Sequence, residues 1–309
     1  MKRYFRVMLG KGSNLAAECV AGNFIGVEYD IDQDLTNWLA GEWRDFNKEF
    51  IRIYLDKHPG KSRISAGLAC GALWTLGKGM QIGDIIFSPD GQGNYRVGKV
   101  TGDYRYAAGE NLFHRRAVEW LPTVFERAAT PQSLQRAGSA GTISDITIYA
   151  QEIENLIAGQ PAVTVSAVAD SEDGDPAIFA LEKHLEDFLV ANWENTELGK
   201  NFAIFEEDGV KTGQQFNIGG MGQIDILAIS KDKKRLLVIE LKKGRPSDKV
   251  VGQILRYMGY VKAELLEPEQ EVEGMIIALE DDKKLSLAIS MVPSISFYRY
   301  EINFKLVKG

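Results

Sequence analysis

Two apolar stretches that each contain charged residues constrain this chain more than any other feature. The first runs from Gln223 to Ile229 and contains Asp225, and the second runs from Leu236 to Lys243 and contains Glu240 and Lys242. Side chains alternate between the two faces of a strand, so Glu240 and Lys242 project from the same face. A charge in an otherwise buried strand costs free energy unless a partner or a metal compensates it. The pattern therefore predicts two central strands with a functional polar site.

The spacing of these residues resembles the signature of the PD-(D/E)XK nucleases, an Asp followed about a dozen residues later by Glu-x-Lys. The alternative is a surface hairpin with a scattered ion pair. Surface hairpins alternate apolar with polar residues, whereas both stretches here are apolar on both faces. The resemblance implies that Asp225, Glu240 and the main-chain carbonyl of Leu241 bind a metal, and that Lys242 assists catalysis.

A helix is predicted directly after the second strand. Ser247 is a candidate N-cap, and apolar residues recur at helical spacing through about Leu265. Gln253 and Tyr257 are four residues apart and share one face of this helix. The pair resembles the Gln-x-x-x-Tyr element of NucS/EndoMS-like and Mrr-type catalytic domains, which implies a supporting catalytic role for both. An ordinary amphipathic helix is the alternative.

The PD-(D/E)XK core usually opens with a helix that supplies another acid. Asp175-Pro176 predicts such a helix start, and an apolar stripe follows it. Glu182 lies closer to the centre of that stripe than Glu186 does, so Glu182 is the predicted catalytic and metal-binding acid. A solvated glutamate is the alternative, and Glu186 is the second candidate.

The resemblance predicts metal-assisted hydrolysis of a phosphodiester. Carboxylate and carbonyl oxygens suit Mg²⁺, with Mn²⁺ as a substitute. The metal would activate a water, and Lys242 would orient that water or stabilise the transition state. The expected partner is double-stranded DNA, including duplexes with modified bases, and the expected assembly is a homodimer, because a double-strand break needs two centres.

The N-terminal part is rich in strand signals and resembles PUA-like barrels of the EVE and YTH kind, over about residues 1–122. The resemblance implies an aromatic pocket that receives a flipped base. The candidates for this pocket are Trp38, Trp43, Trp74, Tyr104 and Tyr106, and the alternative for each of them is an ordinary core residue. The candidates for binding phosphates are Arg96, Lys99, Arg105, Arg115, Arg116, Lys243 and Arg245.

The predicted architecture is a two-domain α+β and α/β chain. Residues 1–125 form the PUA-like β-barrel and residues 176–309 form the PD-(D/E)XK αβα core. Residues 126–175 form an acidic linker with 2 Lys and Arg against 8 Asp and Glu, in which Ser144 to Ala158 is predicted to be a short helix. Most of the net charge of −7 lies in this linker, so the charge is compatible with a DNA partner without predicting one.

Composition excludes several classes. The 2 cysteines are far apart, which argues against a zinc site or a disulfide framework, and no apolar run approaches the ~20 residues of a membrane span. We therefore expect a cytoplasmic protein without a membrane partner. Three functions compete: a modification-dependent restriction endonuclease in phage defence, a mismatch- or branch-specific repair endonuclease, and a non-catalytic DNA-binding module.

Overall fold

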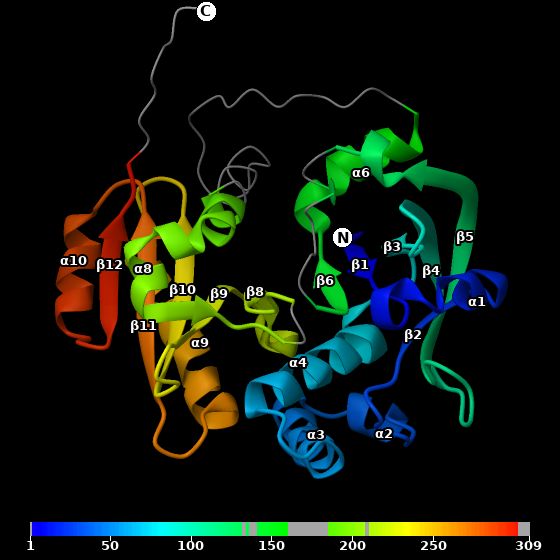
Figure 1. Ribbon diagram of the computed structural model, residues 1–309, viewed down its shortest axis with the longest axis horizontal. Coiled ribbons are helices and arrows are strands. Elements are labelled where there is room, and N and C mark those ends of the chain that lie inside the picture. The colour runs from blue at the N-terminus through cyan, green and yellow to red at the C-terminus, as the bar shows by residue number, and fades with distance from the viewer. Residues whose placement is uncertain (1, 132–133, 136–140, 160–184, 208–209, 302–309) are drawn as a thin grey trace, which may run out of the picture. The chain divides into compact units, whose positions relative to one another are not determined.

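The computed structural model describes residues 2–131, 134–135, 141–159, 185–207 and 210–301. The chain divides into two compact units (Figure 1). Unit 1 comprises Met1–Ser166 and Glu206–Gln223, and unit 2 comprises Ala167–Phe205 and Ile224–Gly309. Each unit has a sheet of its own, which confirms the predicted mixed α and β architecture.

Unit 1 is built on one mixed sheet whose strand order is β2-β5-β4-β3-β1-β6. β1 pairs with β3 in parallel, and the remaining neighbours are antiparallel. β2 and β6 end the sheet in the described part of the chain, where it forms a half-barrel. The predicted PUA-like β-barrel stays a prediction. The strands are β1 (Tyr4–Val7), β2 (Phe24–Val27), β3 (Ile85–Pro89), β4 (Asn94–Tyr106), β5 (His114–Glu126) and β6 (Ile143–Asp145).

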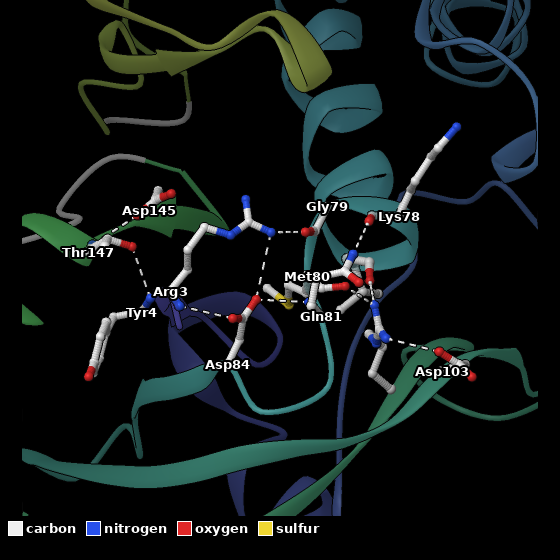
Figure 2. Close-up of polar contacts among 12 residues, drawn as sticks. Arg3, Tyr4, Lys78, Gly79, Met80, Gln81, Asp84, Asp103, Asp145 and Thr147 are labelled. Carbon is white, nitrogen blue, oxygen red and sulfur yellow. Dashed lines mark hydrogen bonds and ion pairs between the residues drawn. The ribbon is translucent and has the colours of Figure 1, made fainter. Parts of the chain in front are cut away.

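A buried carboxylate joins the starts of β1 and β3 (Figure 2). Asp84 accepts hydrogen bonds from the backbone N–H groups of Arg3, at 2.9 Å, and Gln81, at 2.8 Å. The Arg3 guanidinium lies 3.7 Å from the same carboxylate and donates to the carbonyl of Gly79. Asp84 is therefore buried with its hydrogen bonds made, as an interior carboxylate must be.

The helices of unit 1 pack through a large aromatic cluster. The Ser62 hydroxyl caps α4 by accepting from the N–H of Ser65. The Phe46 ring centroid on α3 lies 5.2 Å from that of Trp74 on α4 and 4.4 Å from that of Phe50. The helices are α1 (Ala16–Ala21), α2 (Thr36–Leu39), α3 (Trp43–Lys57), α4 (Arg63–Trp74) and α6 (Ala150–Ile157).

Residues 206–223 belong to unit 1, although the sequence placed them in the nuclease domain. β8 (Gln214–Asn217) and the turn after it lie against α4. The Asn217 amide donates to the Thr75 hydroxyl at 2.9 Å. Gly219 adopts φ +62°, and a Cβ at this position would lie 2.6 Å from the Trp43 ring. The close approach of Gly219 to an aromatic ring of α3 fixes this segment on the N-terminal unit.

The predicted helix from Ser144 to Ala158 is corrected in its first half. Ser144 lies in β6, where it pairs with Arg6 of β1, and the helix α6 starts only at Ala150. The residues around Ser144 alternate between the two faces of a strand edge, and a sheet partner distant in sequence decides their conformation. Part of the predicted linker therefore completes the sheet of unit 1.

Unit 2 is built on a sheet with the order β12-β11-β10-β9-β7. β10 pairs antiparallel with β9 and parallel with β11, so both predicted charge-bearing strands are central. Residues 185–191 are helical and pack on one face, and α9 packs on β10 and β11. The elements are β7 (Phe202–Ile204), β9 (Gln223–Ser230), β10 (Arg235–Lys242), β11 (Glu271–Ala278), β12 (Ile295–Arg299), α8 (Glu197–Asn201), α9 (Lys249–Tyr260) and α10 (Lys283–Ser290).

Candidate active site

The register of β9 and β10 places the two predicted acids opposite each other. Ile226 pairs with Ile239, so Asp225 and Glu240 lie one position further along the same antiparallel pair. The Leu241 N–H donates to the Asp225 carboxylate (Oδ2) at 2.8 Å. This bond holds Asp225 at the end of the ladder beside the Glu-x-Lys segment.

Glu240 and Lys242 project from one face of β10, as their spacing predicts. The Lys242 ammonium lies 2.9 Å from the Glu240 carboxylate (Oε1). Glu240 is buried, with 2% of its surface exposed, whereas Lys242 is partly exposed. A cation that is partly exposed can reach both the buried acid and a bound substrate.

Helix α9 covers the face of the sheet on which these residues lie. Glu240 pairs with Ile276 of β11, two positions from Gly274, and a Cβ on Gly274 would lie 3.1 Å from Ile254 of α9. On the same helix the Gln253 amide donates to the Tyr257 hydroxyl at 3.2 Å. Burial raises the pKa of Tyr257, and the negative charges of Glu240 and Asp225 raise it further. Tyr257 therefore lies within electrostatic reach of the two acids, and Gln253 is hydrogen-bonded to Tyr257.

The acids of unit 2 repel one another. The pKa of Asp225 is raised well above its ordinary value, first by burial and then by the charges of Glu240 and Glu186. The Leu241 N–H and the charge of Lys242 oppose this shift without cancelling it. Like charges held together in a site of low polarity disfavour ionisation and favour a bound cation.

The helix acid near this pair is Glu186. It is buried, with 2% of its surface exposed, on the helical residues 185–191. Glu182, the acid that the helix phase favoured, lies outside the described residues, so its role stays a prediction. Val190 and Trp193 are also buried on this side, and including them moves the centre of the apolar stripe towards Glu186. That longer apolar stripe is the sequence signal that could have identified Glu186 as the inward-facing acid.

The donor set suits a hard divalent cation. No three Asp, Glu, His or Cys side chains of the described residues lie together as a metal site. Mg²⁺, however, commonly takes only one or two carboxylates and completes its shell with waters and phosphate oxygens. Asp225 and Glu240 provide carboxylate ligands of this kind at the end of the β9–β10 ladder, and Leu241, whose carbonyl is the predicted further ligand, follows Glu240 and donates its N–H to Asp225.

The predicted basic residues after β10 have contacts of their own. The carbonyl of Lys243 accepts a hydrogen bond from the Tyr300 hydroxyl at 2.8 Å, and the Lys243 side chain is partly exposed. Arg245 is exposed and lies 3.0 Å from the Asp282 carboxylate. Both side chains remain accessible to a phosphate, so their predicted role remains a prediction.

Two of the predicted pocket aromatics are core residues. Trp43 and Trp74 are each 6% exposed, and their rings meet edge to face at 5.5 Å within the α3–α4 cluster. Trp38 differs, because 39% of its surface is exposed, and its ring meets that of Phe50 at 5.4 Å with the two planes 80° apart. The sequence could not separate them, because a tryptophan is as compatible with a core as with a pocket wall, and the three lie on three different helices whose packing the sequence does not give.

Tyr104 takes part in a buried hydrogen-bond network instead of a cage. Its hydroxyl lies 2.8 Å from Nδ1 of His114 and accepts from the backbone N–H of Leu35 at 3.1 Å. Nε2 of His114 lies 2.8 Å from the carbonyl of Ile31. The carbonyl requires Nε2 to donate. Burial lowers the pKa of His114 to about 4, so the ring is neutral at pH 7 and Nδ1 accepts from the Tyr104 hydroxyl. Tyr106 lies beside this network, partly exposed, with its hydroxyl on Asp32.

Two of the predicted phosphate-binding residues are buried, which does not fit that role. Arg115 and Arg116 are each 3% exposed. Arg115 donates to the carbonyl of Leu112 and stacks on Phe24, with its guanidinium carbon 3.8 Å from the ring centroid. Arg116 donates to the carbonyls of Gly102, Leu76 and Met80. Lys99 and Arg105 are exposed and Arg96 is partly exposed, so these three remain accessible to a phosphate.

Part of the chain is similar to a family without an assigned function. Residues 5–147, just under half of the chain, match the model of a domain of unknown function, DUF8426. No curated protein matches the chain.

Solved structures give remote likenesses only. They include an EndoMS complex with double-stranded DNA (TM-score 0.33, 14% identity, 69% of this chain and 63% of that one) and a repair endonuclease from Pyrococcus abyssi (TM-score 0.30, 14% identity, 69% and 66%). EndoMS in its apo form is a third (TM-score 0.30, 16% identity, 68% and 62%). The chain spans less than two thirds of the length of each of these structures.

Across the described residues, no helix combines the length and the apolar character that crossing a membrane requires.

Proposed function

We propose that the chain is a metal-dependent DNA endonuclease of the PD-(D/E)XK type whose catalytic centre lies in unit 2. One observation carries this proposal: Asp225 and Glu240 face each other across the central strand pair, with Lys242 2.9 Å from Glu240. A surface hairpin would not bury Glu240, and a purely structural ion pair would not need a second and third acid beside it.

Each residue of the centre has a distinct task in this proposal. Asp225, Glu240 and the Leu241 carbonyl would hold Mg²⁺ or Mn²⁺, with Glu186 or Glu182 as a further acid. The metal supplies a Lewis acid for the phosphate and lowers the pKa of a bound water. Lys242 stabilises the negative charge that develops on the phosphate. Gln253 and Tyr257 bind near the scissile phosphate from α9.

The test is cleavage of a supercoiled plasmid and of labelled duplexes with added Mg²⁺ or Mn²⁺. Wild-type protein should nick or cut, and EDTA should stop the reaction. Lys242→Met should bind DNA with nearly unchanged affinity and lose cutting, because the lysine acts on the transition state. Cutting at the wild-type rate by Lys242→Met would show that the centre lies elsewhere.

We further propose that unit 1 is a PUA-like reader of a flipped base and that the enzyme acts in modification-dependent restriction. Among the predicted pocket aromatics, Trp38 is exposed and Tyr106 is partly exposed. The backbone N–H of Leu35, just before the helix of Trp38, donates a hydrogen bond to the hydroxyl of Tyr104, which is two residues from Tyr106. A stacking residue must offer an open ring face to a base. This hydrogen bond joins the segment before Trp38 to the strand that carries Tyr106, which supports a common pocket for the two side chains.

Binding to modified and to mismatched duplexes distinguishes this function from repair. Binding should favour one modified base, and Trp38→Ala should erase that preference while metal-dependent nicking persists. Trp43→Phe is the matched control, because Trp43 lies in the core, and it should keep the preference. A preference for mismatches that Trp38→Ala does not change would assign the enzyme to repair. Light scattering on DNA should show a homodimer.

A further inference from the structure

Three parallel strands of unit 2 end at the edge of the sheet where Lys242 lies. β10 ends at Lys242, which pairs with Ala278, the last residue of β11. Ala278 pairs in turn with Arg299, the last residue of β12. β10, β11 and β12 therefore lie side by side and end in one row (Figure 1). The chain leaves β10 at this row, through residues 243–245.

Tyr300 joins this edge of the sheet to the segment that follows β10. Its backbone N–H donates to the carbonyl of Ala278 at 3.0 Å, which attaches its main chain to the end of β11. Its hydroxyl donates to the carbonyl of Lys243 at 2.8 Å. Its ring is partly buried and packs against the core cluster that includes Leu241 and Ile277. Because its backbone and its ring are both held, the hydroxyl of Tyr300 has a defined position.

Two contacts further along the segment are weaker. The N–H of Glu280 donates to the carbonyl of Gly244 at 3.4 Å, which is long for an N–H···O bond. Arg245 lies 3.0 Å from the Asp282 carboxylate, but the Arg245 side chain is 62% exposed, and an exposed ion pair contributes little to stability. The hydrogen bond from Tyr300 is the shortest of the three contacts and lies nearest to the end of β10.

The segment needs such a restraint because its second residue is a glycine. Gly244 has no side chain to restrict its backbone, its φ is not positive, and a Cβ there would have no atom within 4 Å. Lys242 carries its ammonium on a flexible four-carbon stem, 2.9 Å from the Glu240 carboxylate. Movement of the backbone directly after Lys242 would shift this ammonium relative to a bound phosphate.

We propose that Tyr300 is a positioning residue of the nuclease centre. Through the carbonyl of Lys243 it fixes the end of β10 and, with it, the ammonium of Lys242. This inference rests on the proposed nuclease function and adds a residue that acts through the backbone of β10 and not on the metal ligands. A partly buried tyrosine hydroxyl also takes an acceptor for stability alone, so the test separates the rate of cutting from stability.

The experiment measures four properties of the full-length protein: the single-turnover rate of plasmid cutting at saturating Mn²⁺, the affinities for Mn²⁺ and for DNA, and the Tm. Tyr300→Phe keeps the ring and removes the hydroxyl. The cutting rate should fall by about tenfold, because the lysine is misplaced by a fraction of an ångström. Both affinities should stay at their wild-type values. The Tm should fall by no more than a few degrees, as for the loss of one hydrogen bond.

Two further variants distinguish positioning from a purely structural role. Tyr298→Phe is the matched control, because Tyr298 lies two residues away on β12, is 48% exposed and loses the same hydroxyl, and its cutting rate should not change. Gly244→Ala restrains the segment in a different way. Added to Tyr300→Phe, it should restore part of the lost cutting rate, which a purely structural tyrosine would not allow.

The proposal is overturned if Tyr300→Phe cuts at the wild-type rate while Lys242→Met is inactive, because the centre would then be correct and the hydrogen bond unnecessary. It is also overturned if Tyr300→Phe loses affinity for Mn²⁺ together with its rate, or if Gly244→Ala restores nothing. If Lys242→Met cuts as fast as wild type, the proposed function itself is wrong, and the role of Tyr300 falls with it.

Discussion

Both units bury charged side chains, but the groups around those side chains differ. In unit 1, Asp84 and Arg116 are surrounded by groups of opposite polarity. In unit 2, burial raises the pKa of Asp225, and the negative charges of Glu240 and Glu186 raise it further. Burial of charge alone therefore does not indicate function. What distinguishes the candidate centre is that further acids act on Asp225 in addition to the lysine at Glu240, an arrangement that costs stability unless a further cation joins it.

The largest effect is expected from neutralising one acid of unit 2. Asp225→Asn keeps the shape and the hydrogen bond from Leu241 and removes one negative charge. Cutting should fall by more than about 100-fold, because metal binding and phosphate activation are lost together. Without metal, the same variant should melt higher than wild type, since the repulsion from Glu240 is relieved. Glu271→Gln, an exposed acid of the same sheet, should change neither property.

In unit 1, removal of a buried charge should lower the thermal stability instead of raising it. Arg116→Met should destabilise the unit by about 3–5 kcal/mol, because carbonyls that accept from Arg116 would remain buried without a donor. Calorimetry that resolves the two units measures this. A variant as stable as wild type would mean that the contrast between the units is wrong.

The third prediction concerns acid stability. Burial lowers the pKa of His114 to about 4, below its ordinary value of 6.5. The folded state then contains a neutral His114. Its contribution to the free energy of unfolding is complete above pH 6.5 and is lost as the pH falls from 6.5 towards 4. The loss should amount to about 3 kcal/mol. Urea unfolding of wild type and His114→Gln across this range measures it, and parallel curves for the two proteins would argue against a neutral His114.

Substitutions at Gly219 and Gly252 test whether residues 206–223 are part of unit 1. Gly219→Ala should lower the stability of unit 1 by about 1–3 kcal/mol, because φ is +62° and the Cβ would meet Trp43. Gly252→Ala lies in α9 with no atom within 4 Å of the new Cβ, and should stabilise unit 2 by about 0.5–1 kcal/mol. If Gly219→Ala shifts only the transition of unit 2, the assignment of this segment is wrong.

Local patterns predicted unit 2 better than unit 1. The run from Gln223 to Lys242 contains its own strand signals, its own turn and the alternation that places Glu240 and Lys242 on one face, so β9 and β10 follow from sequence within one or two residues. The sheet pairing of Ser144 depends on β1, far away in the chain, and its helix prediction failed. The burial of Arg115 depends on the ring of Phe24, and that of Arg116 on the carbonyls of Leu76 and Met80. These groups are distant in the chain, so no spacing rule contains them.

The most direct test of the central claim is a calorimetric titration of the full-length protein with Mn²⁺, with Asp225→Asn and Lys242→Met alongside. The account predicts that wild type and Lys242→Met bind Mn²⁺ and gain thermal stability, while Asp225→Asn loses both responses. Binding by Asp225→Asn with wild-type affinity would show that the facing acids of β9 and β10 are not a cation site, and the nuclease assignment would lose its support.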